Sequence, residues 1–288
     1  MKNKIKAVVL DIDGVIVGNL EGVNFPHPSE KIRKVLQNVH DTGIPVSFIT
    51  AKPVFAAKEN IKLVGIDNPH IANNGSTIFN PIQDKIIHQI VFPSNDVLKI
   101  IQALPKDIYI NLFSNYDYYL QKELKSSFTD QYTKIVEREP VLADIESIAK
   151  TIPISKINIY AKNEKEKIEI EKILSDFSEY LVRWSTHPFI SPIKILNLTA
   201  RGASKRAGVE YLLRYLKVPE DEVLGVGDTI GDWDFIEICG YKAAMGNSTE
   251  ELKEKIDTSD TRQMIGGHVN EDGIMDIFKY FGLLNYDR

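Results

Sequence analysis

The sequence is poor in three features that often identify a class of protein: cysteine, long apolar runs and an excess of basic charge. Its single cysteine, Cys239, excludes an internal disulfide and a Cys-x-x-Cys metal site and is typical of a small core residue. No apolar run approaches the ~20 residues of a membrane-spanning helix, and the run before Asp11 is too short for a secretory signal. We therefore expect a cytoplasmic protein with no membrane partner.

Acidic side chains outnumber basic ones, with 40 Asp and Glu against 35 Lys and Arg and a net charge of −5. Such a surface gives no long-range attraction to nucleic acid, so we expect no nucleic-acid partner. Hydrophobic residues make up 43% of the chain and charged residues 26%, which is typical of a globular rather than a disordered protein. The 288 residues are enough for two domains.

Strand-like and helix-like segments alternate at both ends of the chain. Near the N-terminus the expected strands span 5–10 and 46–50, and the expected helices span 28–43 and 53–65. The same alternation returns at 204–256. This order predicts an α/β fold with a Rossmann-like parallel-sheet core.

The middle of the chain follows a different order. Its expected strands span 86–91, 108–112, 156–160, 180–184 and 193–198. The last two follow each other without a helix between them, which favours antiparallel pairing. We therefore predict an α+β domain over 81–198, inserted into a core that is formed by 1–80 and 199–288.

Polar side chains follow three of the expected core strands at the point where each strand ends. In chain order they are Asp11, Asp13, Thr50, Asp228 and Asp232. Ligands of open α/β sheets bind outside the carboxyl ends of the strands, so we expect these side chains to converge. Lys205 begins the helix after the inserted domain and is expected to join them.

Four carboxylates in one pocket cannot all stay ionised without a compensating cation. Mg²⁺ prefers oxygen ligands from a few carboxylates, with water and substrate phosphate completing its shell. Such a cation, together with Lys205, would attract a phosphate dianion. An ionised aspartate is also a competent nucleophile toward phosphorus. The residues therefore point to phosphoryl chemistry with Mg²⁺ as the cofactor.

Four short segments resemble the motifs of the haloacid dehalogenase superfamily of phosphatases. They are, in the order of the family, Asp11-Ile-Asp13-Gly14-Val15 (DxDGT/V in the family), Thr50, Lys205 and Gly227-Asp228-x-x-x-Asp232. Three further segments are similar to its Cof-type branch: Asn73-Asn74-Gly75, Gly202-Ala-Ser-Lys205 and Met245-Gly-Asn-Ser248. That branch carries a large α+β (type IIB) cap between the second and third motifs, where the inserted domain is expected.

The resemblance implies a catalytic role for four of the matched residues. Asp11 would attack phosphorus and form an aspartyl-phosphate, while Asp13 would protonate the leaving alcohol and then deprotonate the hydrolytic water. Thr50, with the neighbouring Ala51 and Lys52, would bind phosphoryl oxygens. Lys205 would bind the substrate and neutralise charge shared by Asp11 and the phosphoryl group.

The resemblance also implies the metal ligands. Asp11, the carbonyl of Asp13 and Asp228 would hold Mg²⁺, and Asp232 would bind it through water or orient Lys205. The simpler alternative for Asp232 is the N-cap of its helix.

Two positions depart from the Cof-type pattern. Thr50-Ala51-Lys52 stands where the branch usually has Thr-Gly-Arg, so the charge is kept and the fork geometry of arginine is lost. Gly231 stands where the fourth motif usually has Asn. These departures leave the core chemistry in place and bear on substrate preference and the metal shell.

The function that these observations favour is hydrolysis of a small soluble phosphate ester, with sugar phosphates as the leading class. Two alternatives stay open: a hexose-phosphate mutase of the phosphomannomutase type, and a non-catalytic phosphoacceptor or sensor.

Arg183, Trp184 and His187 are candidates to face the substrate from the cap. The plainer alternative is a packed Trp and an exposed Arg. Neither the substrate nor the oligomeric state follows from the sequence.

Overall fold

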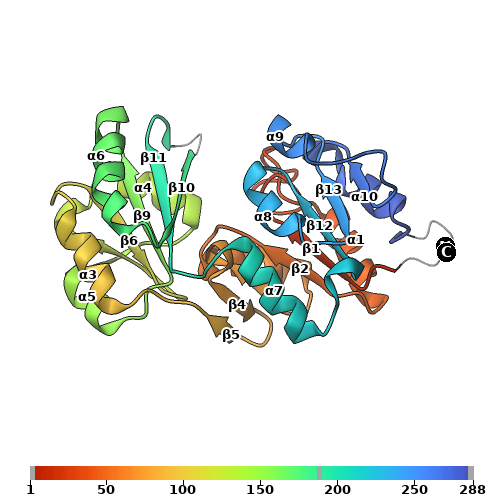
Figure 1. The fold of residues 1–288 in the computed structure, drawn as a ribbon, viewed down its shortest axis with the longest axis horizontal. Helices are drawn as coiled ribbons and strands as arrows, with labels where there is room; N and C mark the ends of the chain where they lie inside the picture. Colours follow the sequence, from red (N-terminus) through yellow and green to blue (C-terminus); the bar gives the residue numbers. More distant parts are fainter. Residues whose placement is uncertain (1–3, 187–189, 285–288) are drawn as a thin grey trace. The chain divides into compact units, whose positions relative to one another are not determined.

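The computed structural model describes residues 4–186 and 190–284, and the chain divides into two compact units. The core unit comprises Met1–Ala51, Ala57–Ile87 and Lys205–Arg288, and the inserted unit comprises Lys52–Ala56 and His88–Ser204. Each unit is built around a sheet of its own (Figure 1). No described helix is long and apolar enough to cross a membrane.

The core unit contains an eight-stranded sheet in the order β14-β13-β12-β1-β2-β3-β4-β5. Its strands are β1 (Ala7–Asp11), β2 (Val46–Ile49), β3 (His70–Ala72), β4 (Thr77–Asn80), β5 (Lys85–Gln89), β12 (Val223–Gly227), β13 (Tyr241–Ala244) and β14 (Gln263–Ile265). Pairing is parallel from β14 through to β3, and β3 and β4 pair antiparallel. The predicted α/β class with a parallel core sheet is confirmed.

Helices of the core unit follow its strands, as expected for βαβ connections, except for α7, which follows the inserted unit. They are α1 (Glu30–Asp41), α2 (Val54–Val64), α7 (Lys205–Leu216), α8 (Trp233–Ile236), α9 (Glu250–Lys253) and α10 (Ile274–Tyr280). Ser29 caps α1, because its side chain accepts a hydrogen bond from the amide of Ile32. Gly43 ends that helix with a φ of 91°, a conformation that suits glycine.

The inserted unit contains a six-stranded sheet in the order β10-β11-β9-β6-β7-β8. The strands are β6 (Tyr109–Phe113), β7 (Tyr118–Gln121), β8 (Val141–Ala143), β9 (Lys156–Ala161), β10 (Leu181–Thr186) and β11 (Lys194–Thr199), and the helices are α3 (Ser94–Ala103), α4 (Ser127–Val136), α5 (Ile145–Thr151) and α6 (Glu164–Leu174). The predicted antiparallel pairing of β10 with β11 is confirmed. Figure 1 shows α3, α5 and α6 on one side of this sheet, where apolar strand residues form a buried cluster.

Several segments differ from the sequence-based expectation. β5 lies at the edge of the core sheet, whereas the sequence analysis assigned this segment to the inserted domain. Within the alternation that was predicted over 204–256, the helices α8 and α9 are only four residues long. Elements that the sequence analysis did not identify are β3, β4, β7, β8, β14, α4, α5 and α10. The three-residue strands among them are too short to show a periodic pattern.

The strand β1 occupies the middle of the core sheet, between β12 and β2 (Figure 1). All five of its residues are buried, so its apolar sequence is explained by neighbours on both faces. The lone cysteine packs in this core: Cys239 is buried and its Sγ lies 3.3 Å from the carbonyl oxygen of Phe235, as predicted. The central position of β1 brings Asp11 to the middle of the carboxyl edge of the sheet.

Candidate active site

Three carboxylates and one lysine meet at the carboxyl edge of the core sheet. Asp11 is the last residue of β1, Asp228 follows β12, and Asp232 ends the short turn η6 (Ile230–Asp232). Carboxylate oxygens of these three residues lie within 4.8 Å of one another. Lys205 reaches them from the first residue of α7. The structure thus brings together four of the residues that the sequence analysis selected.

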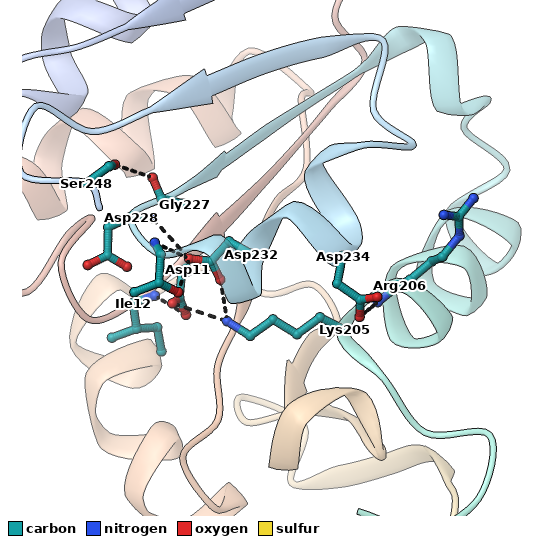
Figure 2. A network of polar contacts seen from close by, with 10 residues as sticks. Asp11, Ile12, Lys205, Arg206, Gly227, Asp228, Asp232, Asp234 and Ser248 are labelled. Atoms are coloured by element: carbon teal, nitrogen blue, oxygen red, sulfur yellow. Dashed lines mark hydrogen bonds and ion pairs between the residues drawn. The ribbon is translucent and has the colours of Figure 1, made fainter. Parts of the chain in front are cut away.

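Lys205 lies between two of these carboxylates, as Figure 2 shows. Its Nζ is 3.2 Å from Asp11 Oδ2 and 2.6 Å from Asp232 Oδ1. The lysine side chain is only 7% exposed. Burial opposes the charged ammonium, but the neighbouring Asp11 and Asp232 outweigh it and raise the pKa of Lys205 above its ordinary value. The ammonium is therefore a permanent positive charge of the site.

Burial and neighbouring negative charges disfavour the ionised form of two of the carboxyl groups, those of Asp11 and Asp228. Burial raises the pKa of Asp11 well above its ordinary value; Lys205 opposes this shift, and the charges of Asp232 and Asp228 add to it. Burial and the charge of Asp232 raise the pKa of Asp228 to about 7. One lysine is therefore too little positive charge for three buried carboxylates. An additional cation with a preference for oxygen ligands fits this donor set.

Asp232 differs from the other two carboxylates because both of its oxygens already accept hydrogen bonds. Oδ1 accepts from Lys205 Nζ, and Oδ2 accepts from the amides of Asp228 (3.0 Å) and Thr229 (2.9 Å) and from the Thr229 hydroxyl (3.2 Å). Despite full burial, Lys205 and these bonds lower the pKa of Asp232 below its ordinary value. Asp232 stands at the N-cap position of α8, as the simpler alternative predicted, but its side chain makes no capping bond to that helix.

Two neighbouring residues explain how the loop around Asp228 and the start of α7 are held. Asp234 Oδ2 accepts from the amide of Arg206 at 3.0 Å, which fixes the first turn of the helix that carries Lys205 (Figure 2). The hydroxyl of Ser248 donates to the carbonyl of Gly227 at 3.3 Å, just before Asp228. Sequence reasoning missed Asp234. It included Ser248 only as part of a segment similar to the Cof-type branch.

Gly14 has to be glycine for two reasons. Its φ is 77°, in the left-handed region. A Cβ at this position would also lie 1.9 Å from Asp228 Oδ2. The backbone next to Asp13 therefore packs directly on the carboxylate of Asp228. Asp13 itself is exposed and is outside the group of three close carboxylates.

Thr50 lies directly after β2, whose Ile49 pairs with Asp11 of β1. Its side chain is buried, and its carbonyl accepts from the amide of Asn74 at 3.1 Å. Asn74 belongs to a turn, Asn73–Gly75 (η1), in which all three residues have positive φ. This turn meets α7 where a Cβ on Gly208 would lie 2.9 Å from the Cα of Gly75. The sequence analysis connected these segments only through a resemblance.

The remaining candidates are placed less centrally. Ala51 is exposed at the end of the core segment, and Lys52 is half-buried and begins the segment that groups with the inserted unit. Trp184 packs against the apolar cluster of the inserted unit, and its Nε1 donates to Glu171 Oε1 at 2.8 Å. Arg183 pairs with Asn197 across β10 and β11. His187 lies outside the described residues.

Comparison with known proteins gives one family over nearly the whole chain. Residues 8–278 match the model of the haloacid dehalogenase-like hydrolases. The chain is 25% identical to a putative phosphatase of Haemophilus influenzae, over 93% of this chain and 95% of the relative. It is 23% identical to the 5-amino-6-(5-phospho-D-ribitylamino)uracil phosphatase YitU of Bacillus subtilis, over 98% and 100% of the two chains.

Solved structures give the same result for the fold. The phosphatase BT1666 of Bacteroides thetaiotaomicron superimposes with a TM-score of 0.79 at 23% identity, covering 98% of this chain and 97% of that one. The sugar phosphatase BT4131, described as a subclass IIB member, superimposes with a TM-score of 0.75 at 18% identity, covering 97% and 100%. At these identities the structures establish a shared fold.

Proposed function

The chain belongs to the haloacid dehalogenase-like hydrolases, and from this premise we propose that it is a Mg²⁺-dependent phosphomonoesterase that works through an aspartyl-phosphate. The predicted family and the predicted enzyme class, a phosphatase of this superfamily, are both confirmed. The mechanism, the metal and the substrate class below are our proposal. We also propose a cytoplasmic location and no nucleic-acid partner, as the composition suggests.

The observation that carries the proposal is the cluster of Asp11, Asp228 and Asp232 around a single lysine. Asp11, the carbonyl of Asp13 and Asp228 would hold Mg²⁺. Asp232 would bind it through water at most, because its oxygens already accept from Lys205 and from backbone amides. Bound Mg²⁺ would supply charge neutralisation and polarisation of the phosphoryl group.

Asp11 is the proposed nucleophile. Its Oδ1 accepts from the amide of Ile12 at 2.9 Å, and its Oδ2 lies beside Lys205. Both contacts favour the ionised carboxylate that attack on phosphorus requires. As the bond between an Asp11 oxygen and phosphorus forms, the ester P–O bond breaks and Asp13 gives its proton to the leaving oxygen. Thr50, Ala51 and Lys52 would bind the phosphoryl oxygens.

The second half of the reaction returns the enzyme to its starting state. Asp13, now a carboxylate, takes a proton from water as the water oxygen attacks phosphorus. The bond from phosphorus to Asp11 breaks, and inorganic phosphate leaves. Lys205 stays next to Asp11 throughout, so it offsets the charge that develops on the phosphoryl oxygens. Atoms and protons balance without a further reactant.

For the substrate we propose a small phosphate ester with a polyhydroxylated leaving group. BT4131 is described as a sugar phosphatase, and the name of YitU describes a phospho-D-ribityl compound. Both names support a sugar phosphate or a related ester for this chain. The test is a phosphate-release screen over sugar phosphates and other small esters, with Mg²⁺ or with a chelator. Loss of release in the chelator is expected.

The Asp11→Asn variant tests the nucleophile. It should fold normally and lose hydrolysis of a generic aryl phosphate, because a neutral amide is a poor nucleophile. Retention of substantial hydrolysis would contradict the assignment. The two alternatives give different products: a mutase yields an isomerised sugar phosphate and needs a bisphosphate activator, and a sensor yields a long-lived phosphorylated Asp11 without turnover.

A further inference from the structure

The segment that follows Asp13 contains no helix and no multi-residue strand. Between β1 and α1 the backbone has only two isolated bridges, Asp13 with Val17 and Glu21 with Phe25. We call residues 14–25 the flap segment. Turn bonds hold it locally, among them the amides of Ile16 and Val17 to the carbonyl of Ile12, and side chains from elsewhere in the core unit attach it to the loop near the C-terminus. Asp13, the proposed proton donor, immediately precedes it.

Asn247 connects the start of the flap segment to a loop near the C-terminus. Its Nδ2 donates to the carbonyl of Gly14 at 2.9 Å. Its Oδ1 accepts from the amide of Val269 at 2.8 Å. A primary amide supplies a donor and an acceptor from one rigid group, and carboxylate or hydrocarbon side chains of this size do not. The peptide between Gly14 and Val15, one residue beyond Asp13, is thus tied to the loop at 268–270.

A second anchor holds the other end of the flap segment to the same loop. Asn24 Nδ2 donates to Asn270 Oδ1 at 3.0 Å and to the Val269 carbonyl at 3.3 Å. Asn270 Nδ2 donates to Asn19 Oδ1 at 2.6 Å. A Cβ on Gly18 would lie 2.2 Å from Asn24 Nδ2, so the backbone there is in close contact with these amides. Asn24 is only 5% exposed.

From these contacts we infer that Asn247 is a positioning residue for Asp13. On one side the Gly14 backbone packs on Asp228, where no Cβ fits. On the other side its carbonyl is held by Asn247. The second anchor holds Asn19 and Asn24, in the rest of the flap segment, on the same loop through Asn270. Asp13 is consequently set at a fixed place although its own side chain is exposed.

This inference rests on the proposed role of Asp13 as general acid, and it predicts a dependence on the leaving group. An alkoxide such as a sugar oxygen is a poor leaving group and needs a proton in the transition state. A p-nitrophenolate leaves without that help. A displaced Asp13 therefore slows departure of the leaving group from alkyl phosphates and leaves the same step almost unchanged for aryl phosphates, so the two esters are compared by leaving-group release in the first turnover. A general loss of structure would slow both.

The test compares Asn247→Ala with the wild-type protein on an alkyl phosphate and on p-nitrophenyl phosphate. For the alkyl ester, kcat should fall about 10- to 100-fold with little change in KM, since proton donation contributes roughly 10²–10⁴-fold. Release of p-nitrophenolate in the first turnover should slow less than about threefold, because that step needs no proton from Asp13. Asn247→Asp is the second variant: it keeps the shape and the acceptor for Val269 and removes the donor to Gly14.

The matched control is Asn80→Ala, in the same unit. Asn80 is buried and connects Asp67 with the amides of Ile82 and Gln83, but it does not contact the flap segment. Its loss should affect both substrates alike. In an Asp13→Ala background, Asn247→Ala should cause no further selective loss on the alkyl ester, because the group that it positions is absent.

Two results would overturn the inference: equal losses on both esters in the first turnover, and a selective loss that persists in the Asp13→Ala background. Failure of the underlying function is a separate outcome, because it would appear as activity retained by Asp11→Asn. Unfolding curves for each variant identify a general loss of stability.

Discussion

Mild acid should destabilise the core unit through one buried histidine, His70 of β3. The ring is completely buried and stacks on Phe48, with ring centroids 5.1 Å apart. Its Nδ1 accepts from the amide of Phe48 at 3.1 Å, which requires the neutral ring with its hydrogen on Nε2. Burial lowers the pKa of His70 from 6.5 to about 3. The folded protein therefore excludes a proton that the unfolded chain accepts.

The sign and size of the effect follow from these two values. Below pH 6.5 the unfolded chain binds the proton and is stabilised, and the folded state does not bind it until the pH approaches the folded pKa of about 3. Stability that His70 contributes at neutral pH is therefore lost as the pH falls through this window. The loss is about 1.4 kcal/mol at pH 5.5 and about 2 kcal/mol at pH 5, relative to neutral pH.

The assay is urea unfolding at pH 7.5 and pH 5.5, followed by tryptophan fluorescence. A Trp184→Phe background leaves Trp233, in α8 of the core unit, as the reporter. His70→Gln removes the titrating group, so its free energy of unfolding should fall by about 1.4 kcal/mol less than that of the parent between the two pH values. The parent protein, measured at both pH values, is the reference for this difference. Equal falls for the parent and His70→Gln would refute the reasoning.

Three further predictions concern the site itself. Chelation should abolish phosphate release, and added Mg²⁺ should raise the Tm, because a cation relieves the crowding of Asp11 and Asp228; an unchanged Tm and unchanged activity would contradict this. Lys205→Met should lower stability by about 3–5 kcal/mol and remove activity, since it leaves two buried carboxylates without their cation; urea unfolding and phosphate release measure both. Gly14→Ala should reduce activity strongly, because its Cβ meets Asp228; near wild-type kinetics would contradict that.

Much of the site was predictable because strand ends are visible in the sequence. Asp11, Thr50 and Asp228 each follow an apolar run, and parallel strands bring such residues to one edge. The two bonds of Asp232 to backbone amides were not predictable, because they depend on the fold of the loop between β12 and α8. The sequence suggested a helix cap there, and the observed bonds run back into the preceding loop instead.

Contacts between distant segments escaped prediction for the same reason. Asn247 and Gly14 are 233 positions apart, and only the folded core unit brings them together. β5 shows a related limit: its short apolar pattern identified a strand, but the choice of sheet is decided by its partners. His70 gave no signal at all, since a lone histidine in a three-residue strand has no periodic context.

Lys205 contacts both Asp11 and Asp232, and this double contact matters for the charge balance of the proposed reaction cycle. In the proposed aspartyl-phosphate, the carboxyl group of Asp11 is part of a mixed anhydride with phosphate and is no longer a free anion. The ammonium still has Asp232 at 2.6 Å, held in turn by two backbone amides. A buried cation without a partner would have to lose its proton or attract water. Asp232 makes both unnecessary, so the lysine keeps one ionisation state while its other neighbour changes chemically.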